Sequence, residues 1–173
     1  MKRKKRSAGQ TCALLGMLLA LALLCSYVET LIPISFGIPG IKLGLANLVV
    51  LLALYRLGAG EALMISAARI FLAGFLFGNL ASILYSLAGG LLSFLVMIFL
   101  KKILNMGLLP VSVAGGIFHN LGQVLVAALV VENLNLLYYM SILFFAGTVT
   151  GGLIGLVARE LLKRLPNNEW RKT

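Results

Sequence analysis

Long apolar segments separated by short polar breaks run along most of this chain. Five of these segments approach the ~20 residues that a helix needs to cross a ~30 Å hydrocarbon layer. They occupy residues 11–31, 61–80, 83–100, 111–131 and 136–158. A sixth segment, residues 43–57, is shorter, and at ~1.5 Å per residue its helix would begin below the membrane surface. The pattern predicts six membrane helices, of which the second is short.

Glycine, proline and asparagine mark the breaks between the segments, so the loops are short. We expect one membrane domain over residues 11–162, with basic tails at residues 1–10 and 163–173. In the last segment, glycines recur at every fourth position from residue 147 to residue 155. This spacing lets helices approach closely and predicts a packing seam inside the chain, with a partner-subunit face as the alternative.

The composition supports a membrane location. Hydrophobic residues make up 61% of the chain and charged residues 12%, and the mean hydropathy is +1.04. Soluble domains average about 45–50% apolar and about 25% charged residues. The chain is therefore predicted to be an all-α integral membrane protein.

The basic residues behind the net charge of +10 are unevenly distributed along the chain. If both termini are cytoplasmic, all but two of the 15 Lys and Arg residues fall on the cytoplasmic side, as the positive-inside rule expects. The exceptions are Lys42, on the outer side, and Arg69, within the third segment. No soluble basic fold is left to bind nucleic acid, so we expect none among the partners.

The first segment follows a basic stretch, a combination that also occurs in cleaved export signals. We expect a retained helix, because the apolar run is long enough to span and Leu24 stands before Cys25 where a lipoprotein signal needs a small residue. Cys12 and Cys25 form no CxxC motif and have no neighbouring histidine. We therefore expect neither a metal nor a cofactor.

Arg69 lies near the middle of the third segment, at a depth where charge is least tolerated. A central arginine costs roughly 2.5–3.5 kcal/mol on insertion scales and usually faces a polar cavity, a partner or a ligand. Ala62, Ser66 and Ala73 are small neighbours on one side of it. Arg69 is therefore a candidate ligand-binding residue.

Three hydrogen-bonding side chains, those of His119, Asn120 and Gln123, fall within about one turn of the fifth segment. Helical spacing places them within an arc of about 100°, at a depth similar to that of Arg69. They are candidate ligand contacts. A hydrogen-bonded interior residue is the alternative for the single histidine, and contacts between helices are the alternative for the two amides.

Lys42 and Asn47 lie at the start of the short second segment, where free backbone amides favour an anion. With Arg69 they predict a cationic cavity that narrows from the outer face to mid-membrane. Glu29 and Glu132 are candidate charge partners. An ion pair between Arg69 and one of these glutamates is the alternative to a ligand site.

Three stretches of the chain carry motifs of a known family. They are residues 39–47, residues 68–78 with Arg69, Gly74 and Gly78, and residues 118–123 with His119, Asn120 and Gln123. Together they resemble the bacterial Gx transporter family, also labelled heptaprenyl diphosphate synthase component I, over about residues 11–162. The resemblance implies a six-helix bundle similar to the substrate-binding S components of energy-coupling-factor vitamin transporters. It also implies a likeness to a membrane subunit of flavin-based extracellular electron transfer systems.

The sequence lacks features that a prenyl diphosphate synthase and an S component typically have. The chain has no aspartate and its five glutamates lie in different segments, whereas prenyl diphosphate synthases hold Mg²⁺ with aspartate-rich motifs, so we expect no enzyme activity. The alanines that dock S components, spaced by four on the first helix, are interrupted here by Met17 and Leu21. No P-loop is present, so an ATP-driven cycle would need a separate ATPase.

We therefore expect a binding or uptake subunit of the bacterial cytoplasmic membrane for a small anionic, partly apolar molecule. An isoprenoid phosphate, a flavin-like compound or a vitamin-like compound fits this description. The expected partners are the lipid bilayer, the ligand and a separate ATPase or coupling module, or electron-transfer subunits. The alternative is a non-catalytic accessory of prenyl diphosphate or quinone metabolism or of flavin-based extracellular electron transfer. A third hypothesis is ion conduction past Arg69 and His119. It is weaker because no carboxylate relay accompanies these two residues.

Overall fold

The computed structural model describes residues 7–31 and 44–164, which are almost entirely helical and contain no strand. The elements are α1 (Ala8–Leu31), α2 (Leu45–Arg56), α3 (Ala59–Phe77), α4 (Leu80–Lys102), α5 (Leu108–Val130), the 3₁₀ helix η1 (Leu134–Tyr139) and α6 (Met140–Arg164). By length and composition, α1, α3, α4, α5 and the η1–α6 unit can cross a membrane, and α2 is a shorter apolar helix. The predicted all-α class and the short second helix are confirmed.

The junction between α3 and α4 differs from the prediction, because the apolar pattern continued to residue 80 and resumed at residue 83. The Asn79 side chain accepts a hydrogen bond from the Ser82 N–H (2.8 Å), and Ser82 Oγ accepts one from the Asn79 N–H (3.0 Å). This reciprocal capping box fixes the start of α4 at Leu80. Hydrophobicity alone does not register such a polar signal.

The last helix also differs from the predicted segment, residues 136–158. The chain first forms η1 after Asn133, whose side chain accepts a backbone N–H. α6 then continues to Arg164, and Glu160 forms ion pairs with Lys163 and Arg164 in its final turns. Oppositely charged pairs three and four residues apart stabilise an exposed helical turn, so the helix extends beyond its apolar part.

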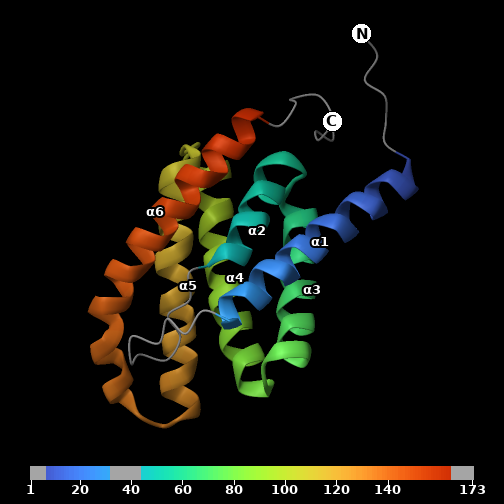
Figure 1. The fold of residues 1–173 in the computed structure, drawn as a ribbon. Helices are drawn as coiled ribbons and strands as arrows, with labels where there is room; N and C mark the ends of the chain where they lie inside the picture. Colours follow the sequence, from blue (N-terminus) through green and yellow to red (C-terminus); the bar gives the residue numbers. More distant parts are fainter. Residues whose placement is uncertain (1–6, 32–43, 165–173) are drawn as a thin grey trace.

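The long helices run beside one another, and α1 crosses the bundle obliquely (Figure 1). Successive helices reverse direction, so that the start of α1 and the end of α6 lie toward the same end of the bundle (Figure 1). α5 packs against both α4 and α6, whereas α2 packs against α1, α3 and α6. α2 therefore has neighbours on several sides although it is short.

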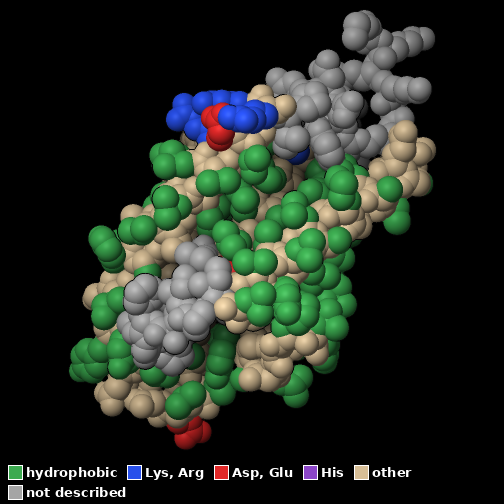
Figure 2. Space-filling model, viewed as in Figure 1, with side chains coloured by type: hydrophobic (Ala, Val, Ile, Leu, Met, Phe, Trp, Pro, Cys, Tyr) green, Lys and Arg blue, Asp and Glu red, His purple; other side chains and the backbone are tan. Residues whose placement is uncertain are grey.

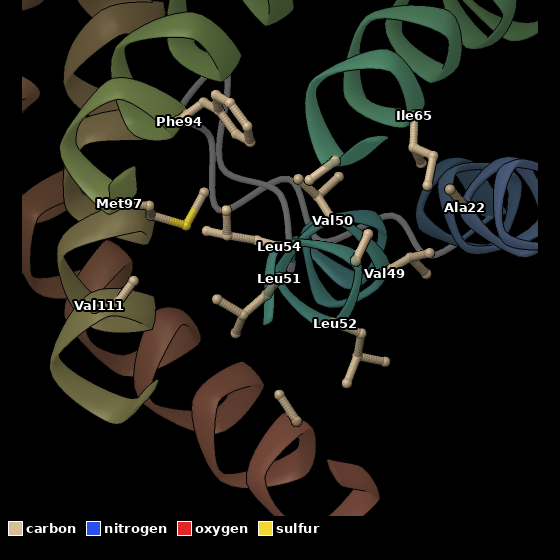
Figure 3. Close-up of a cluster of buried hydrophobic side chains, with 13 residues drawn as sticks. Ala22, Val49, Val50, Leu51, Leu52, Leu54, Ile65, Phe94, Met97 and Val111 are labelled. Atoms are coloured by element: carbon tan, nitrogen blue, oxygen red, sulfur yellow. The ribbon is translucent and has the colours of Figure 1, made fainter. Parts of the chain in front are cut away.

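The hydrophobic core is centred on α2. Val49, Leu51 and Leu54 each expose only 1% of their surface. Figure 3 shows these side chains of α2 together with Phe94 and Met97 of α4, which belong to the same buried cluster. Between Asn47 and Tyr55, α2 is apolar on all sides, which suits an interior position because this part has no polar face to turn toward solvent.

Glycines bring α6 into backbone contact with α5. A Cβ at Gly147 would lie 2.9 Å from the Gly116 carbonyl oxygen, and one at Gly151 would lie 2.7 Å from the Ser112 carbonyl oxygen. Ser112 Oγ also donates a hydrogen bond to the Gly151 carbonyl (2.6 Å). The packing seam predicted from the glycine spacing in the last helix is therefore confirmed, and it lies inside the chain.

Apolar side chains cover much of the outer surface (Figure 2). Phe75, Leu80 and Leu129 are examples, with 71%, 72% and 72% of their surface exposed. A soluble monomer rarely shows extended apolar surface, whereas lipid is a favourable surrounding for it. Basic side chains gather at the end of the molecule where α6 finishes (Figure 2). The surface is that of a multi-pass membrane protein.

Candidate functional site

The candidate site begins at the first turn of α2. Gly44 precedes this helix with a φ of 75°, a left-handed conformation that glycine adopts at little cost. The Asn47 N–H donates to the Gly44 carbonyl (2.8 Å), which closes the turn. A Cβ at Gly44 would also lie 3.0 Å from Ile154 Cδ1 of α6. The helix therefore starts inside the bundle, next to α6.

Glu29, near the end of α1, reaches the N-terminus of α2. Its Oε1 accepts a hydrogen bond of 2.6 Å from the Leu45 N–H. The first N–H groups of a helix have no partner within the helix and form the positive end of its dipole, so a carboxylate is stabilised there. Glu29 also interacts electrostatically with Arg69. This candidate charge partner thus interacts with both the start of α2 and the buried arginine.

Arg69 is buried in α3, with 9% of its surface exposed. Its Nη2 donates a hydrogen bond of 3.3 Å to Asn47 Oδ1, which links α3 to the first turn of α2. Its Nε is buried and has no hydrogen-bond partner among the described residues. Burying a charged group is costly unless its donors are satisfied. The part of the bundle that the structure describes therefore leaves one guanidinium donor for an additional acceptor.

The polar residues of α5 divide between two neighbouring helices. Asn120 Nδ2 donates a hydrogen bond of 3.0 Å to the Leu143 carbonyl of α6. By contrast, a Cβ at Gly89 of α4 would lie 2.7 Å from Gln123 Cγ and 3.2 Å from His119 Nδ1. His119 and Gln123 thus pack on α4, and Asn120 forms the contact between helices that was its alternative role. The sequence spacing had predicted one common polar face.

Gln123 is buried, with 5% of its surface exposed. Its Oε1 has no hydrogen-bond partner within residues 7–31 and 44–164. A buried acceptor left without a donor costs roughly 1–3 kcal/mol, and native proteins usually satisfy such atoms through protein, water or ligand. Gln123 is therefore a second interior group with hydrogen-bonding capacity for a ligand.

A pair of glycines in α4 positions these groups. Gly89 faces α5, while a Cβ at Gly90 would lie 2.9 Å from Ile70 Cδ1 of α3. Ile70 directly follows Arg69, so α3 and α5 approach the glycine pair from different sides. The structure accordingly assembles one cluster from Glu29, Asn47 and Arg69, and a second from His119 and Gln123. The sequence analysis did not single out these two glycines, although adjacent glycines inside an apolar helix are a recognisable sign of close approach.

The remaining predicted residues are Lys42 and Glu132. Lys42 lies outside the residues that the structure describes. Glu132 is exposed in the turn after α5, where it has a φ of 52°. Among the described residues there is no group of three or more His, Cys, Asp and Glu side chains that could hold a metal ion.

Sequence reasoning missed the interactions at the other end of α2. Arg56 Nη2 donates to the Leu162 carbonyl of α6, and Lys101 Nζ of α4 donates to the Leu54 carbonyl. The Lys101 ammonium also lies 4.3 Å from the centroid of the Tyr55 ring. These contacts join the basic ends of α2, α4 and α6. The sequence signal was a basic residue in the last turn of each of these three helices, which had been interpreted only as a sign of orientation.

These observations define a multi-pass helical membrane protein with a buried arginine and buried amides inside its bundle. The chain belongs to the family described as heptaprenyl diphosphate synthase component I, which it matches over residues 18–161. The family inferred from the three sequence motifs is thus confirmed. Searches of curated proteins and of solved structures found no match.

Proposed function

We propose that this chain is a membrane-embedded binding or uptake subunit for a small anionic, partly apolar molecule in the bacterial cytoplasmic membrane. The observation that carries the proposal is the buried Arg69 guanidinium, whose Nε has no hydrogen-bond partner among the described residues. Intramembrane arginines usually pair with other groups or mark a ligand path. An isoprenoid phosphate, a flavin-like compound or a vitamin-like compound combines an anionic or polar group with an apolar body.

The polar residues take different roles in this proposal. Arg69 and Lys42 neutralise the anionic group of the ligand, and Asn47 orients the guanidinium through its hydrogen bond. His119 and Gln123 hydrogen-bond polar atoms of the ligand. Asn120, a predicted ligand contact, acts on the site by holding α5 against α6.

We further propose a bundle like that of the S components, with six membrane crossings and both termini in the cytoplasm. The alternating helix directions and the basic residues at the ends of α2, α4 and α6 support this topology. The start of α2 then lies within the membrane, in its outer half. Polar backbone at such a depth is tolerated where it is buried in protein or lines a wet cavity, as a ligand site does.

The proposal includes no catalysis by the chain itself. Magnesium-dependent prenyl transfer needs clustered carboxylates, and this chain has no aspartate. Its glutamates lie on different elements, with Glu29 in α1, Glu61 in α3 and Glu160 in α6. Uptake against a gradient would need a separate ATPase or coupling module, which co-purification from native membranes would identify.

Ligand binding by the purified protein tests the proposal. Mass spectrometry of small molecules retained after gentle purification identifies candidates, and farnesyl diphosphate serves as a defined probe with an anionic head and an apolar tail. Arg69→Met removes the charge and all guanidinium donors. Because a hydrogen bond to a charged group contributes about 1.5–3 kcal/mol, affinity should fall roughly 10- to 100-fold.

Arg159→Met is the matched control, since Arg159 is exposed on α6. This variant should bind the ligand with the same affinity as the unmodified protein. A confirmed ligand that binds equally well to Arg69→Met would remove Arg69 from the site.

The second candidate function is a non-catalytic membrane accessory of prenyl diphosphate or quinone metabolism, or of flavin-based extracellular electron transfer. The description of the family as a component of heptaprenyl diphosphate synthase favours it. It predicts that deleting the chain reduces prenyl diphosphate production, electron flow or assembly of a partner complex while uptake of candidate ligands stays normal. Uptake that disappears together with the chain would favour the binding subunit instead.

A further inference from the structure

Glu29 is the residue that an anion-binding role does not by itself explain. A helix N-terminus is a favourable position for an anionic ligand, because its N–H groups and its dipole attract negative charge. At the start of α2, however, the Leu45 N–H already binds the Glu29 carboxylate at 2.6 Å. The chain thus supplies an anion of its own at the place that would otherwise receive the anionic group of the ligand.

Glu29 and Arg69 are brought together by the same helical turn. Glu29 binds the Leu45 N–H, and Arg69 binds the side chain of Asn47, two residues further along. Arg69 is buried and Glu29 is partly buried, so solvent screens their charges less than it screens surface charges. An anionic group that reaches the Arg69 Nε therefore also experiences the negative charge of Glu29.

We propose that Glu29 is a specificity-determining residue that makes the Arg69 site favour ligands with a weakly charged head group over ligands with a highly charged one. The inference rests on the proposed function, since it concerns the same site. Glu29 is not proposed to contact the ligand through a hydrogen bond. It acts through its charge, from a position fixed by the start of α2.

The physical reason is that electrostatic energy scales with the product of the charges. Every negative charge added to the ligand increases its attraction to Arg69 and also its repulsion from Glu29. The carboxylate thereby cancels part of the benefit that a more highly charged ligand would gain. Gln123 offers hydrogen bonds without a formal charge, so it does not restore that benefit.

A purely structural role for Glu29 gives a different expectation. If Glu29 served only to cap α2, removing its charge would affect all ligands alike through the stability of the helix. Glu29→Gln separates the two roles, because its amide oxygen can still accept the Leu45 N–H while the negative charge is gone. Changes in the preference between two ligands then report the charge alone.

The experiment compares farnesyl phosphate with farnesyl diphosphate, which share one apolar tail and differ in head-group charge. Their dissociation constants are measured for the full-length protein in detergent and for the Glu29→Gln variant. We expect Glu29→Gln to improve binding of the diphosphate relative to the monophosphate on the order of tenfold. Glu132→Gln removes an exposed carboxylate elsewhere in the chain and should leave the ratio unchanged.

The outcomes separate this inference from the proposed function. A ratio of dissociation constants unaltered by Glu29→Gln overturns the charge-selecting role, even where Arg69→Met weakens binding and so supports the site itself. An equal change of the ratio in Glu132→Gln overturns it as well, because the effect would then be general. Failure of the unmodified protein and of Glu29→Gln to bind either compound overturns both this inference and the assignment of prenyl phosphates to the site.

Discussion

Asn120 on α5 and Leu143 on α6 are joined by a hydrogen bond of 3.0 Å from the side-chain amide to the backbone carbonyl. Both residues are buried. One turn after Leu143, the glycines of α6 come into backbone contact with α5. The bond therefore continues the α5–α6 seam with a polar contact in a region where water does not compete for it.

Replacing Asn120 with alanine should lower stability and leave the local backbone intact. Interhelical hydrogen bonds in membranes contribute on average about 0.6 kcal/mol and at most about 1.7 kcal/mol, so the loss should fall in that range. Thermal unfolding in detergent measures the change, and Asn135→Ala, at the exposed start of η1, serves as control. A destabilisation equal to that of the control would show that the bond does not contribute.

Enlarging Gly151 should disrupt the packing of α6 on α5. A Cβ at this position would lie 2.7 Å from the Ser112 carbonyl oxygen and 2.9 Å from Val113 Cα, and backbone atoms cannot move aside cheaply. Gly151→Ala should destabilise by about 1–3 kcal/mol, as overpacking typically does. Gly152→Ala is the matched control, because its Cβ would meet only Val113 Cγ2 at 4.0 Å. Equal unfolding temperatures for the two variants would contradict a tight seam.

Gly89→Ala should impair the candidate site through α5. The added methyl group would lie 2.5 Å from the His119 carbonyl oxygen and 2.7 Å from Gln123 Cγ. We expect at least a tenfold loss of ligand affinity, the factor that corresponds to about 1.4 kcal/mol. Gly16→Ala, where a Cβ meets nothing within 4 Å, controls for glycine substitution as such. Unchanged affinity in Gly89→Ala would place the ligand away from His119 and Gln123.

Lys101→Met should loosen the other end of α2. The substitution removes the hydrogen bond to the Leu54 carbonyl and the contact with the Tyr55 ring. The two interactions together should contribute about 1–3 kcal/mol, since a hydrogen bond from a charged donor and a cation–π contact each exceed about 0.5 kcal/mol. Lys102→Met removes an exposed charge beside it and should have little effect on the unfolding temperature. If Lys102→Met lowered the unfolding temperature more than Lys101→Met did, this role of Lys101 would be refuted.

Sequence patterns alone predicted the all-helical class and the approximate extents of the long helices. The length of each apolar run sets whether a helix can cross a hydrocarbon layer, and this relation holds without knowledge of neighbours. For the same reason α2 was predicted to be short, and the four-residue spacing of Gly147, Gly151 and Gly155 sufficed to predict a seam. The motifs around Arg69 and His119 were also specific enough to indicate the family.

Which polar groups contact one another depends on how the helices pack. Helical spacing places His119, Asn120 and Gln123 on one arc, but α4 and α6 flank that arc. Asn120 therefore bonds to α6, whereas the other two side chains pack against α4. The hydrogen bond between Glu29 and the Leu45 N–H likewise joins parts of the chain that no local pattern relates. Hydrophobic periodicity reports the environment of each helix face, whereas hydrogen-bond partners depend on the relative positions of different helices, which only packing fixes.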